Sequence, residues 1–372
     1  MARIKSSPMT IVVFLLILFT KIQSRFEKPF YDDNYIILVM TAILVLLCLM
    51  RNRGRIDKTV SKLLVLLVTY AVVFTFILPN NSISTYIYSF FLAFMAYVLI
   101  VFSAGLYFGK EGAWNLIKKM YVLISAMLIF SYITHFDNCS VFRNLGSLLL
   151  VERDKSSFGS YHANTTADIC LSALSLSLLL NITAKIKYIL IQTGFRKYLT
   201  ISNIIICIVL ISTTSRVGII AGVVMYLSQV YFSLDKYVDN KREIKVLKPM
   251  MLCIIGGLML FVLYVNYIKT GQFDITYRLL NFTVNIPTLI SENRLLIGWG
   301  FVDKSVFANG RIIAGTGYVD NYYLYVLVTT GIVGCIFIAR YVFLLIKNIC
   351  RNNDSIIRND IISIMIMHLT FC

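Results

Sequence analysis

Three arginines and one aspartate lie in the polar stretches that interrupt or separate apolar runs. These residue types suit phosphate chemistry. Arg216 interrupts a long apolar run, Arg278 and Arg294 lie in a polar segment farther along, and Asp320 comes just before the next apolar run. Guanidinium groups bind phosphate oxygens in pairs and keep their charge, so they can stabilise a lipid-diphosphate leaving group without Mg²⁺. A carboxylate nearby can take the proton of an attacking hydroxyl. Arg216, Arg278 and Asp320 are therefore the catalytic candidates.

Arg216, its neighbour Ser215 and Asp320 also have structural interpretations. Arg216 could be an interfacial arginine whose side chain reaches the lipid headgroups. Ser215, beside it, could serve as a helix cap, and Asp320 could do the same, because serine and aspartate are preferred capping residues. For Asp320 the roles of general base and cap are compatible.

The composition indicates a membrane protein. Of 372 residues, 58% are hydrophobic and only 14% are charged, against about 45–50% and about 25% in soluble domains. The net charge of +17 is explained by lysines and arginines in short cytoplasmic loops, and no single basic, aromatic-rich surface supports nucleic-acid binding. The eight cysteines lack C-x-x-C spacing and the three histidines are scattered, so neither a disulfide framework nor a metal site is predicted.

Apolar runs of membrane-spanning length recur along the chain, and a membrane helix needs roughly 20 mostly apolar residues. The candidates are residues 8–22, 34–50, 63–78, 85–108, 118–134, 164–183, 199–213, 216–233, 250–268, 320–346 and a last segment from near 360. The first has no small-residue cleavage site and is interpreted as an anchor. The last is about half a span, either re-entrant or, as we favour, a truncated helix. We predict an all-α polytopic protein with about 11 transmembrane helices in one domain, residues 1–372.

Clusters of lysine and arginine orient these helices. The clusters fall at residues 51–62, 185–197 and 236–248, and a cytoplasmic N-terminus places all three on the inner side. Two longer loops, at about residues 134–163 and 269–319, then lie on the outer face. The break near Arg216 is predicted to be a tight turn at that same face.

Four segments near this outer face each contain glycine together with polar or charged residues. They are Gly159-Ser160-Tyr161-His162-Ala163-Asn164, Ser212-Thr213-Thr214-Ser215-Arg216-Val217-Gly218, Arg278 with Leu296-Ile297-Gly298-Trp299-Gly300-Phe301, and Asp320-Asn321-Tyr322-Tyr323-Leu324 with Gly331-Ile332-Val333-Gly334. In the same order they resemble the G-x-x-H-x-N, S-x-S-R-x-G, R…L-x-G-x-G and H-N-x-x-L…G-x-x-G motifs of the O-antigen polymerase and O-antigen ligase family. The resemblance covers roughly residues 158–346.

This resemblance implies a GT-C-like helical bundle with a large outer loop between the last helices, in a bacterial inner (plasma) membrane. It implies a glycosyltransferase that needs no metal or cofactor and uses a polyprenyl-diphosphate-linked oligosaccharide as donor. A polymerase has the next lipid-linked repeat unit as acceptor, and a ligase has lipid A core. Ligases carry histidine where this chain has Asp320, whereas many polymerases tolerate aspartate there, which favours a polymerase. Membrane lipid, a flippase and a chain-length regulator are candidate partners.

The motif segments also supply candidates for substrate binding. They are Arg294, His162, Asn164, Ser215, Asn321, Trp299 and Tyr322. The polar ones could contact the diphosphate, and the aromatic ones could stack on sugars, although aromatic residues at a membrane interface are also common anchors.

A transporter of lipid-linked oligosaccharides is the alternative from another functional class. Transporters of many folds have paired broken helices in two repeated halves. This chain has one irregular break, near Thr213, and a large one-sided outer loop. That pattern favours an enzyme.

Overall fold

Helices make up nearly all of the structure that can be described. The computed structural model describes residues 8–23, 43, 96–135, 158, 162–186, 193–237, 241–270, 278–298, 322–350 and 355–371. Within these residues the chain forms helices and turns and no strand. The all-α prediction is confirmed for this part of the chain, whereas the runs predicted at residues 34–50 and 63–78 lie outside the described residues, apart from position 43.

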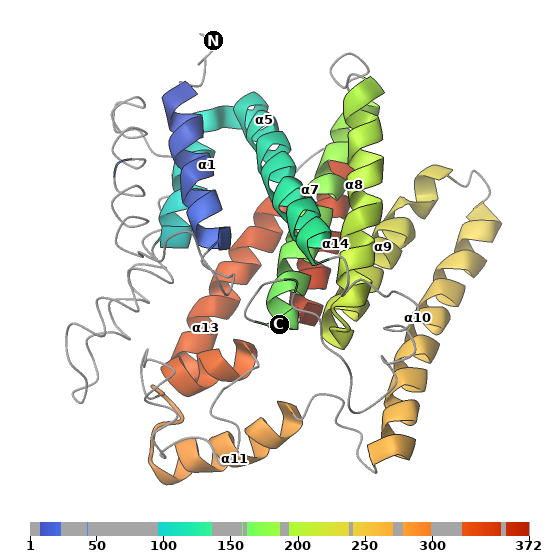
Figure 1. The fold of residues 1–372 in the computed structure, drawn as a ribbon. Helices are drawn as coiled ribbons and strands as arrows, with labels where there is room; N and C mark the ends of the chain where they lie inside the picture. Colours follow the sequence, from blue (N-terminus) through green and yellow to red (C-terminus); the bar gives the residue numbers. More distant parts are fainter. Residues whose placement is uncertain are drawn as a thin grey trace.

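The helices follow the predicted apolar runs closely. They are α1 (Pro8–Gln23), α5 (Ala96–Thr134), α7 (Ala163–Ile186), α8 (Thr193–Ser212), α9 (Arg216–Tyr237), α10 (Lys241–Thr270), α11 (Arg278–Ser291), α13 (Tyr322–Cys350) and α14 (Ser355–Phe371) (Figure 1).

Two elements differ from the predicted pattern. Residues 96–134 form the single helix α5 instead of ending one helix and beginning another. Lysines and a glutamate interrupt the apolar run there, but they are good helix formers, and no proline stops the helix. The expected outer loop at residues 269–319 contains helix α11. A search for membrane-length runs overlooks it, because its 14 residues are too short to cross a bilayer.

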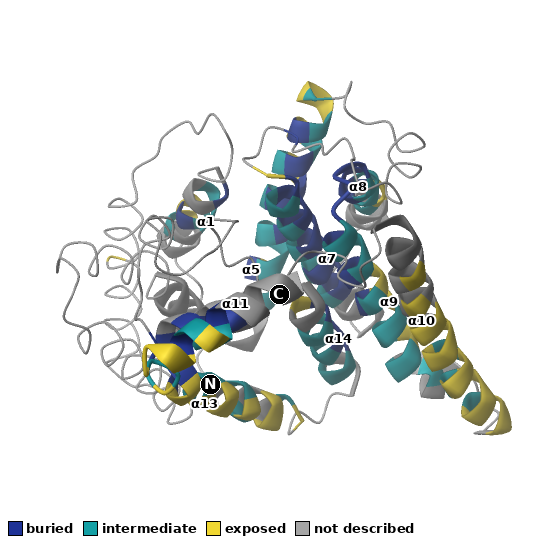
Figure 2. Cartoon of the chain, turned by 90° about the horizontal axis from the view of Figure 1, so that it is seen from below, coloured by how far each residue is buried: buried dark blue, intermediate teal, exposed yellow. Residues whose placement is uncertain are grey.

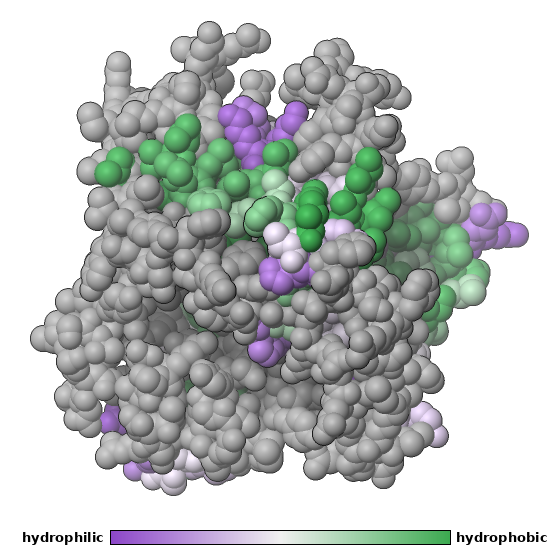
Figure 3. Space-filling view, viewed as in Figure 1, coloured by the Kyte–Doolittle hydropathy of each residue, from purple (hydrophilic) through white to green (hydrophobic). Residues whose placement is uncertain are grey.

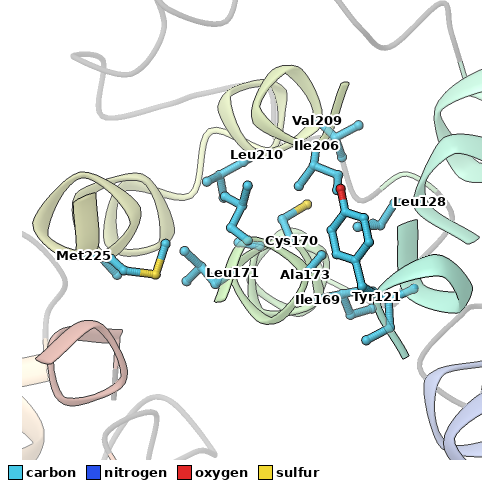
Figure 4. Packing of buried hydrophobic residues seen from close by; sticks show 14 of the residues in the cluster. Tyr121, Leu128, Ile169, Cys170, Leu171, Ala173, Ile206, Val209, Leu210 and Met225 are labelled. Carbon is cyan, nitrogen blue, oxygen red and sulfur yellow. The ribbon is translucent and has the colours of Figure 1, made fainter. Parts of the chain in front are cut away.

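Helix α7 occupies the centre of the bundle, between α5, α8 and α9 (Figure 4). Its residues Cys170, Leu171 and Ala173 are buried against Tyr121 and Leu128 of α5 and against Ile206, Val209, Leu210 and Met225 of α8 and α9. Lipid tails are as apolar as these side chains, so close van der Waals packing has to hold such helices together in a membrane. Small residues such as Ala173 permit that close approach.

A buried polar network also ties the central helices together. The Tyr121 hydroxyl lies 2.5 Å from Ser202 Oγ and donates to Asn203 Oδ1 at 2.8 Å. Asn203 Nδ2 donates in turn to Ser177 Oγ at 2.5 Å. The network joins α5, α8 and α7, and each hydrogen bond is worth on the order of 1 kcal/mol in a membrane interior.

Among the residues that the structure describes, two helical stretches are long and apolar enough to cross a membrane, Trp114–Thr134 and Ala163–Leu180. Shorter apolar helices are Ile201–Ser212, Arg216–Phe232 and Thr330–Leu344. Of Ala163–Leu180, 67% is buried inside the protein, against 33% of Trp114–Thr134, which agrees with the central position of α7. Hydrophobic side chains gather over the described part of the face shown in Figure 3.

Helix α10 lies at the edge of the bundle and is largely exposed (Figure 2). Its middle carries exposed apolar residues such as Leu252, Ile254 and Leu260, and its first turns carry Arg242 and Lys245. An apolar exposed helix with basic residues at one end is the pattern expected of a helix that faces lipid.

The helices from α7 to α10 run alternately up and down in Figure 1. The start of α7, the break between α8 and α9, and the end of α10 therefore lie toward the same end of the bundle, and α11 lies at that end as well. The candidates at these helix starts are His162, Asn164, Ser215, Arg216 and Arg278.

Candidate functional site

The break between α8 and α9 has the geometry of a tight, capped turn. Helix α8 ends at Ser212 and α9 begins at Arg216, as predicted. Thr213 Oγ1 donates to the carbonyl of Leu210 at 2.7 Å and accepts the N–H of Ser215 at 3.2 Å. Thr214 adopts a left-handed conformation with φ 53°, which is uncommon for a β-branched residue. Strain of this kind is characteristic of functional sites.

Ser215 is the N-cap of α9. Its Oγ accepts the N–H of Gly218 at 3.2 Å, and its carbonyl accepts the N–H of Ile219 at 2.9 Å. The side chain is buried, with 2% of its surface exposed, so the hydroxyl has to be satisfied within the protein. The capping role proposed for Ser215 is confirmed.

A second helix begins at the same place. His162 precedes α7, where its Nδ1 accepts the N–H of Asn164 at 3.1 Å and its carbonyl accepts the N–H of Thr165 at 2.9 Å. Nδ1 is therefore an acceptor, which leaves the proton of the neutral ring on Nε2. His162 is exposed at this end of α7.

Asn164 connects the two helix starts. Ser215 Oγ donates to Asn164 Oδ1 at 2.8 Å, across 51 residues of sequence. The Ser215 hydroxyl thus accepts from the backbone of α9 and donates to α7. The bond joins the segment that contains His162 to the segment that contains Arg216.

Arg216 is the first residue of α9 and is partly buried. The N-terminus of each helix carries a partial positive charge of about half an elementary charge. Here the N-termini of α7 and α9 lie side by side, and Arg216 adds a full positive charge at the second. This arrangement favours an anion over a neutral ligand.

Gly218 lets the two helices approach each other. A Cβ added to Gly218 would lie 2.7 Å from Ala167 Cβ of α7, closer than real Cβ atoms come, and 3.2 Å from Ser215 Oγ. Gly222, one turn along, has more room, since its added Cβ would be 3.4 Å from Leu171 and from Leu210. The glycine of the S-x-S-R-x-G-like segment thus fits the small gap between α7 and α9.

A second group of candidates lies beyond α11. Asn293, with φ 56°, ends that helix in a Schellman motif: its N–H donates to Ile290, and the N–H of Arg294 donates to Leu289 at 2.8 Å. Arg294 is partly buried. The turn at residues 295–298 follows it and contacts α13 beside Gly331. The structure therefore joins two further motif segments, those containing Gly298 and Gly331.

The other candidates are placed only in part or not at all. Arg278 begins α11 and Tyr322 begins α13, but their side chains lie outside the described residues, as do Asp320, Asn321 and Trp299 entirely. The structure brings His162, Asn164, Ser215 and Arg216 together. The proximity of Arg216 and Arg278 stays a prediction.

Comparison with known proteins gives one plain result. No family model, curated protein or solved structure matches this chain. The candidate site is accordingly defined by its own residues and geometry.

Two polar residues near these helix starts were not among the site candidates from the sequence. Thr213 stabilises the turn because its hydroxyl both donates and accepts a hydrogen bond. A threonine two residues before a capping serine is the local sequence signal for such bonds. Asp168 is one helical turn after Asn164, on the same face of α7, and is partly buried. It interacts electrostatically with His368 of α14.

Removal of the Ser215–Asn164 bond tests whether the two helix starts are coupled. Ser215→Ala removes a cap and should cost about 0.5–2 kcal/mol of stability, and Asn164→Ala should cost on the order of 1 kcal/mol. Because the residues share one hydrogen bond, the double variant should lose less than the sum, by about 0.5 kcal/mol or more. Thermal unfolding of purified protein in nanodiscs measures this.

Ser291 provides the matched control. It is exposed, and its hydroxyl bonds only to the carbonyl of Thr288 in its own helix among the hydrogen bonds described for it. Ser291→Ala should be additive with Asn164→Ala. Additivity in the Ser215 pair as well would contradict the coupling.

Proposed function

We propose that this protein is a membrane polysaccharide polymerase. It transfers a growing glycan from polyprenyl diphosphate onto the next lipid-linked repeat unit, on the outer face of a bacterial inner membrane. The observation that carries the proposal is the hydrogen bond between Asn164 and Ser215, which joins two motif segments and places Arg216 where two helices begin.

The chemistry of the donor explains why such a site is suitable. The donor diphosphate is already negatively charged, and one further negative charge develops on its terminal phosphate oxygen when the glycan leaves. Arg216 and the positive ends of α7 and α9 provide fixed positive potential without a metal ion. His162, at the start of α7, contacts a phosphate oxygen in this proposal.

The remaining roles complete a direct displacement. The acceptor hydroxyl attacks the anomeric carbon, the bond from that carbon to the phosphate oxygen breaks, and Asp320 takes the hydroxyl proton. Arg278 and Arg294 assist Arg216 at the diphosphate. Asn321 contacts the substrate, and Trp299 and Tyr322 stack on sugar rings. Inversion at the anomeric carbon is carried over from the resemblance.

The proposal includes a topology. About 11 crossings and a cytoplasmic N-terminus stay predictions, because they treat residues 85–108 and 118–134 as two spans, whereas residues 96–134 form one helix. In the proposed GT-C-like bundle, the basic start of α10 lies on the cytoplasmic side. The alternating directions of α7 to α10 support this, because they put the basic start of α10 and the Arg216 break at opposite ends of the bundle (Figure 1). The break is then at the outer face.

The direct test is chain elongation by purified protein in liposomes that contain polyprenyl-diphosphate repeat units. We expect a ladder of products longer than one repeat unit, formed without added divalent metal. Transfer to lipid A core alone would identify a ligase instead. Movement of lipid-linked units across the bilayer without new glycosidic bonds would identify a transporter.

A further inference from the structure

Helix α13 is broken at Gly331, and a segment of the preceding loop fills the break. The sequence predicted one irregular break, near Thr213, so this second break removes the number of breaks as an argument against a transporter. At Gly331 the backbone has φ 64° and ψ −167°, and helical segments lie on both sides. The N–H of Ile332 donates to the carbonyl of Leu295 at 3.0 Å, and the N–H of Val333 donates to the carbonyl of Leu296 at 3.1 Å. We refer to these two bonds as the latch.

The latch supplies hydrogen-bond acceptors for the N–H groups at the start of a helical segment. The first N–H groups of a helix have no partner within the helix. In apolar surroundings an unpaired N–H costs several kcal/mol. The second segment of α13 begins immediately after Gly331, so its first donors need acceptors, and the turn at residues 295–298 supplies them.

Only glycine fits this position. A φ of 64° lies in the left-handed region that glycine adopts without cost. A Cβ at residue 331 would also overlap the backbone of Leu296 and lie 2.5 Å from the backbone nitrogen of Ile297. Backbone atoms held by the latch cannot move aside as a flexible side chain would.

The other end of the turn is held by α11. The N–H of Arg294 donates to Leu289 at 2.8 Å, and the N–H of Gly298 donates to the carbonyl of Arg294 at 2.6 Å. Leu289 is buried, as are Leu324 and Val328 of α13. The backbone of Arg294 is thus fixed from both sides, by the end of α11 and by the break in α13.

We propose that Gly331 is a positioning residue, which through the latch holds Arg294 in place to bind the diphosphate of the donor. This inference rests on the proposed function for the role of Arg294. The latch itself depends only on the backbone contacts. Gly331 does not touch the substrate, so it acts through the turn at residues 295–298.

Hydrogen exchange resolved to single amides tests the latch in the full-length protein in nanodiscs. In the wild type, the amides of Ile332 and Val333 should exchange slowly, although they lie at the start of a helical segment where such amides normally exchange fast. Gly331→Ala should abolish their protection. Fast exchange of these amides in the wild type would overturn the latch, whether or not the variant folds.

Gly256→Ala is the matched control, because a Cβ added to Gly256 of α10 meets nothing within 4 Å. It should leave the exchange of Ile332 and Val333 unchanged. The exchange comparison needs no glycan substrate, so it decides the latch even if the wild type fails to elongate glycans.

Enzyme kinetics test the positioning role of Gly331 separately from the latch. Gly331→Ala and Arg294→Ala should each raise the KM for the lipid-linked donor more than they lower kcat. If Gly331 acts through Arg294, the double variant should lose no more than the worse single variant. Additive losses, or a Gly331→Ala protein with a wild-type KM, would overturn the positioning role.

Discussion

Arg216→Ala is expected to lower the rate of chain elongation by about 10²–10³-fold, the loss typical of removing one group that stabilises a developing charge. The reason is the position of Arg216 at the first turn of α9, beside the start of α7. Without the guanidinium, the leaving diphosphate keeps only the weaker helix dipoles. Elongation of labelled repeat units in liposomes measures the effect, and single lipid-linked units should accumulate in cells.

Three further variants make this prediction specific. Arg216→Lys keeps the charge but loses paired hydrogen bonding, so its activity should fall between those of the wild type and Arg216→Ala. Arg340→Ala is the control: Arg340 is exposed on α13, with its guanidinium 5.8 Å from the centre of the Phe343 ring, and its loss should leave elongation unchanged. Arg278→Ala should share the phenotype of Arg216→Ala. Normal long-chain product from Arg216→Ala would remove this arginine from the mechanism.

Gly218→Ala is expected to destabilise the protein by about 1–3 kcal/mol, the usual cost of an overpacked contact. Its new methyl group would lie 2.7 Å from Ala167 Cβ, so α7 and α9 would have to separate. That movement would stretch the Ser215–Asn164 bond, and activity should fall together with stability. Thermal unfolding in nanodiscs gives the stability, and the elongation assay gives the activity.

Gly256→Ala again provides the comparison, because open space surrounds Gly256 in α10. In a helix, alanine is favoured over glycine by about 0.5–1 kcal/mol, so this change should be neutral or stabilising. Gly222→Ala should fall between the two, since its contacts would be 3.4 Å. Equal effects at Gly218 and Gly256 would show that the gap between α7 and α9 is not tight.

Local features of the site could be predicted from the sequence. The polar segment at residues 212–215 predicts a break in an apolar run, and the structure confirms it between α8 and α9. The capping role of Ser215 was also predictable, because caps depend on residues within one helical turn. The same holds for the helical class of the chain, which follows from the length and spacing of its apolar runs.

Two features within single segments were not predicted, although local signals for them exist. The sequence analysis placed the region around Lys118 between two separate apolar runs, but α5 continues through it. Charged residues such as lysine do not stop a helix. Asn293 ends α11 in a left-handed conformation, which asparagine tolerates. A prediction based on membrane-length runs ignores both signals.

By itself, then, the sequence determined most of the helices, the break at Ser212 and the cap at Ser215, because these depend on neighbours within a few residues. Only the tertiary structure decided that Asn164 bonds to Ser215, which lies 51 residues away, and that Leu295 and Leu296 fill the break at Gly331. The physical reason is that such bonds depend on how closely two backbones approach. A glycine at position 218 or 331 permits that approach, but it does not specify which segment of the chain packs against it.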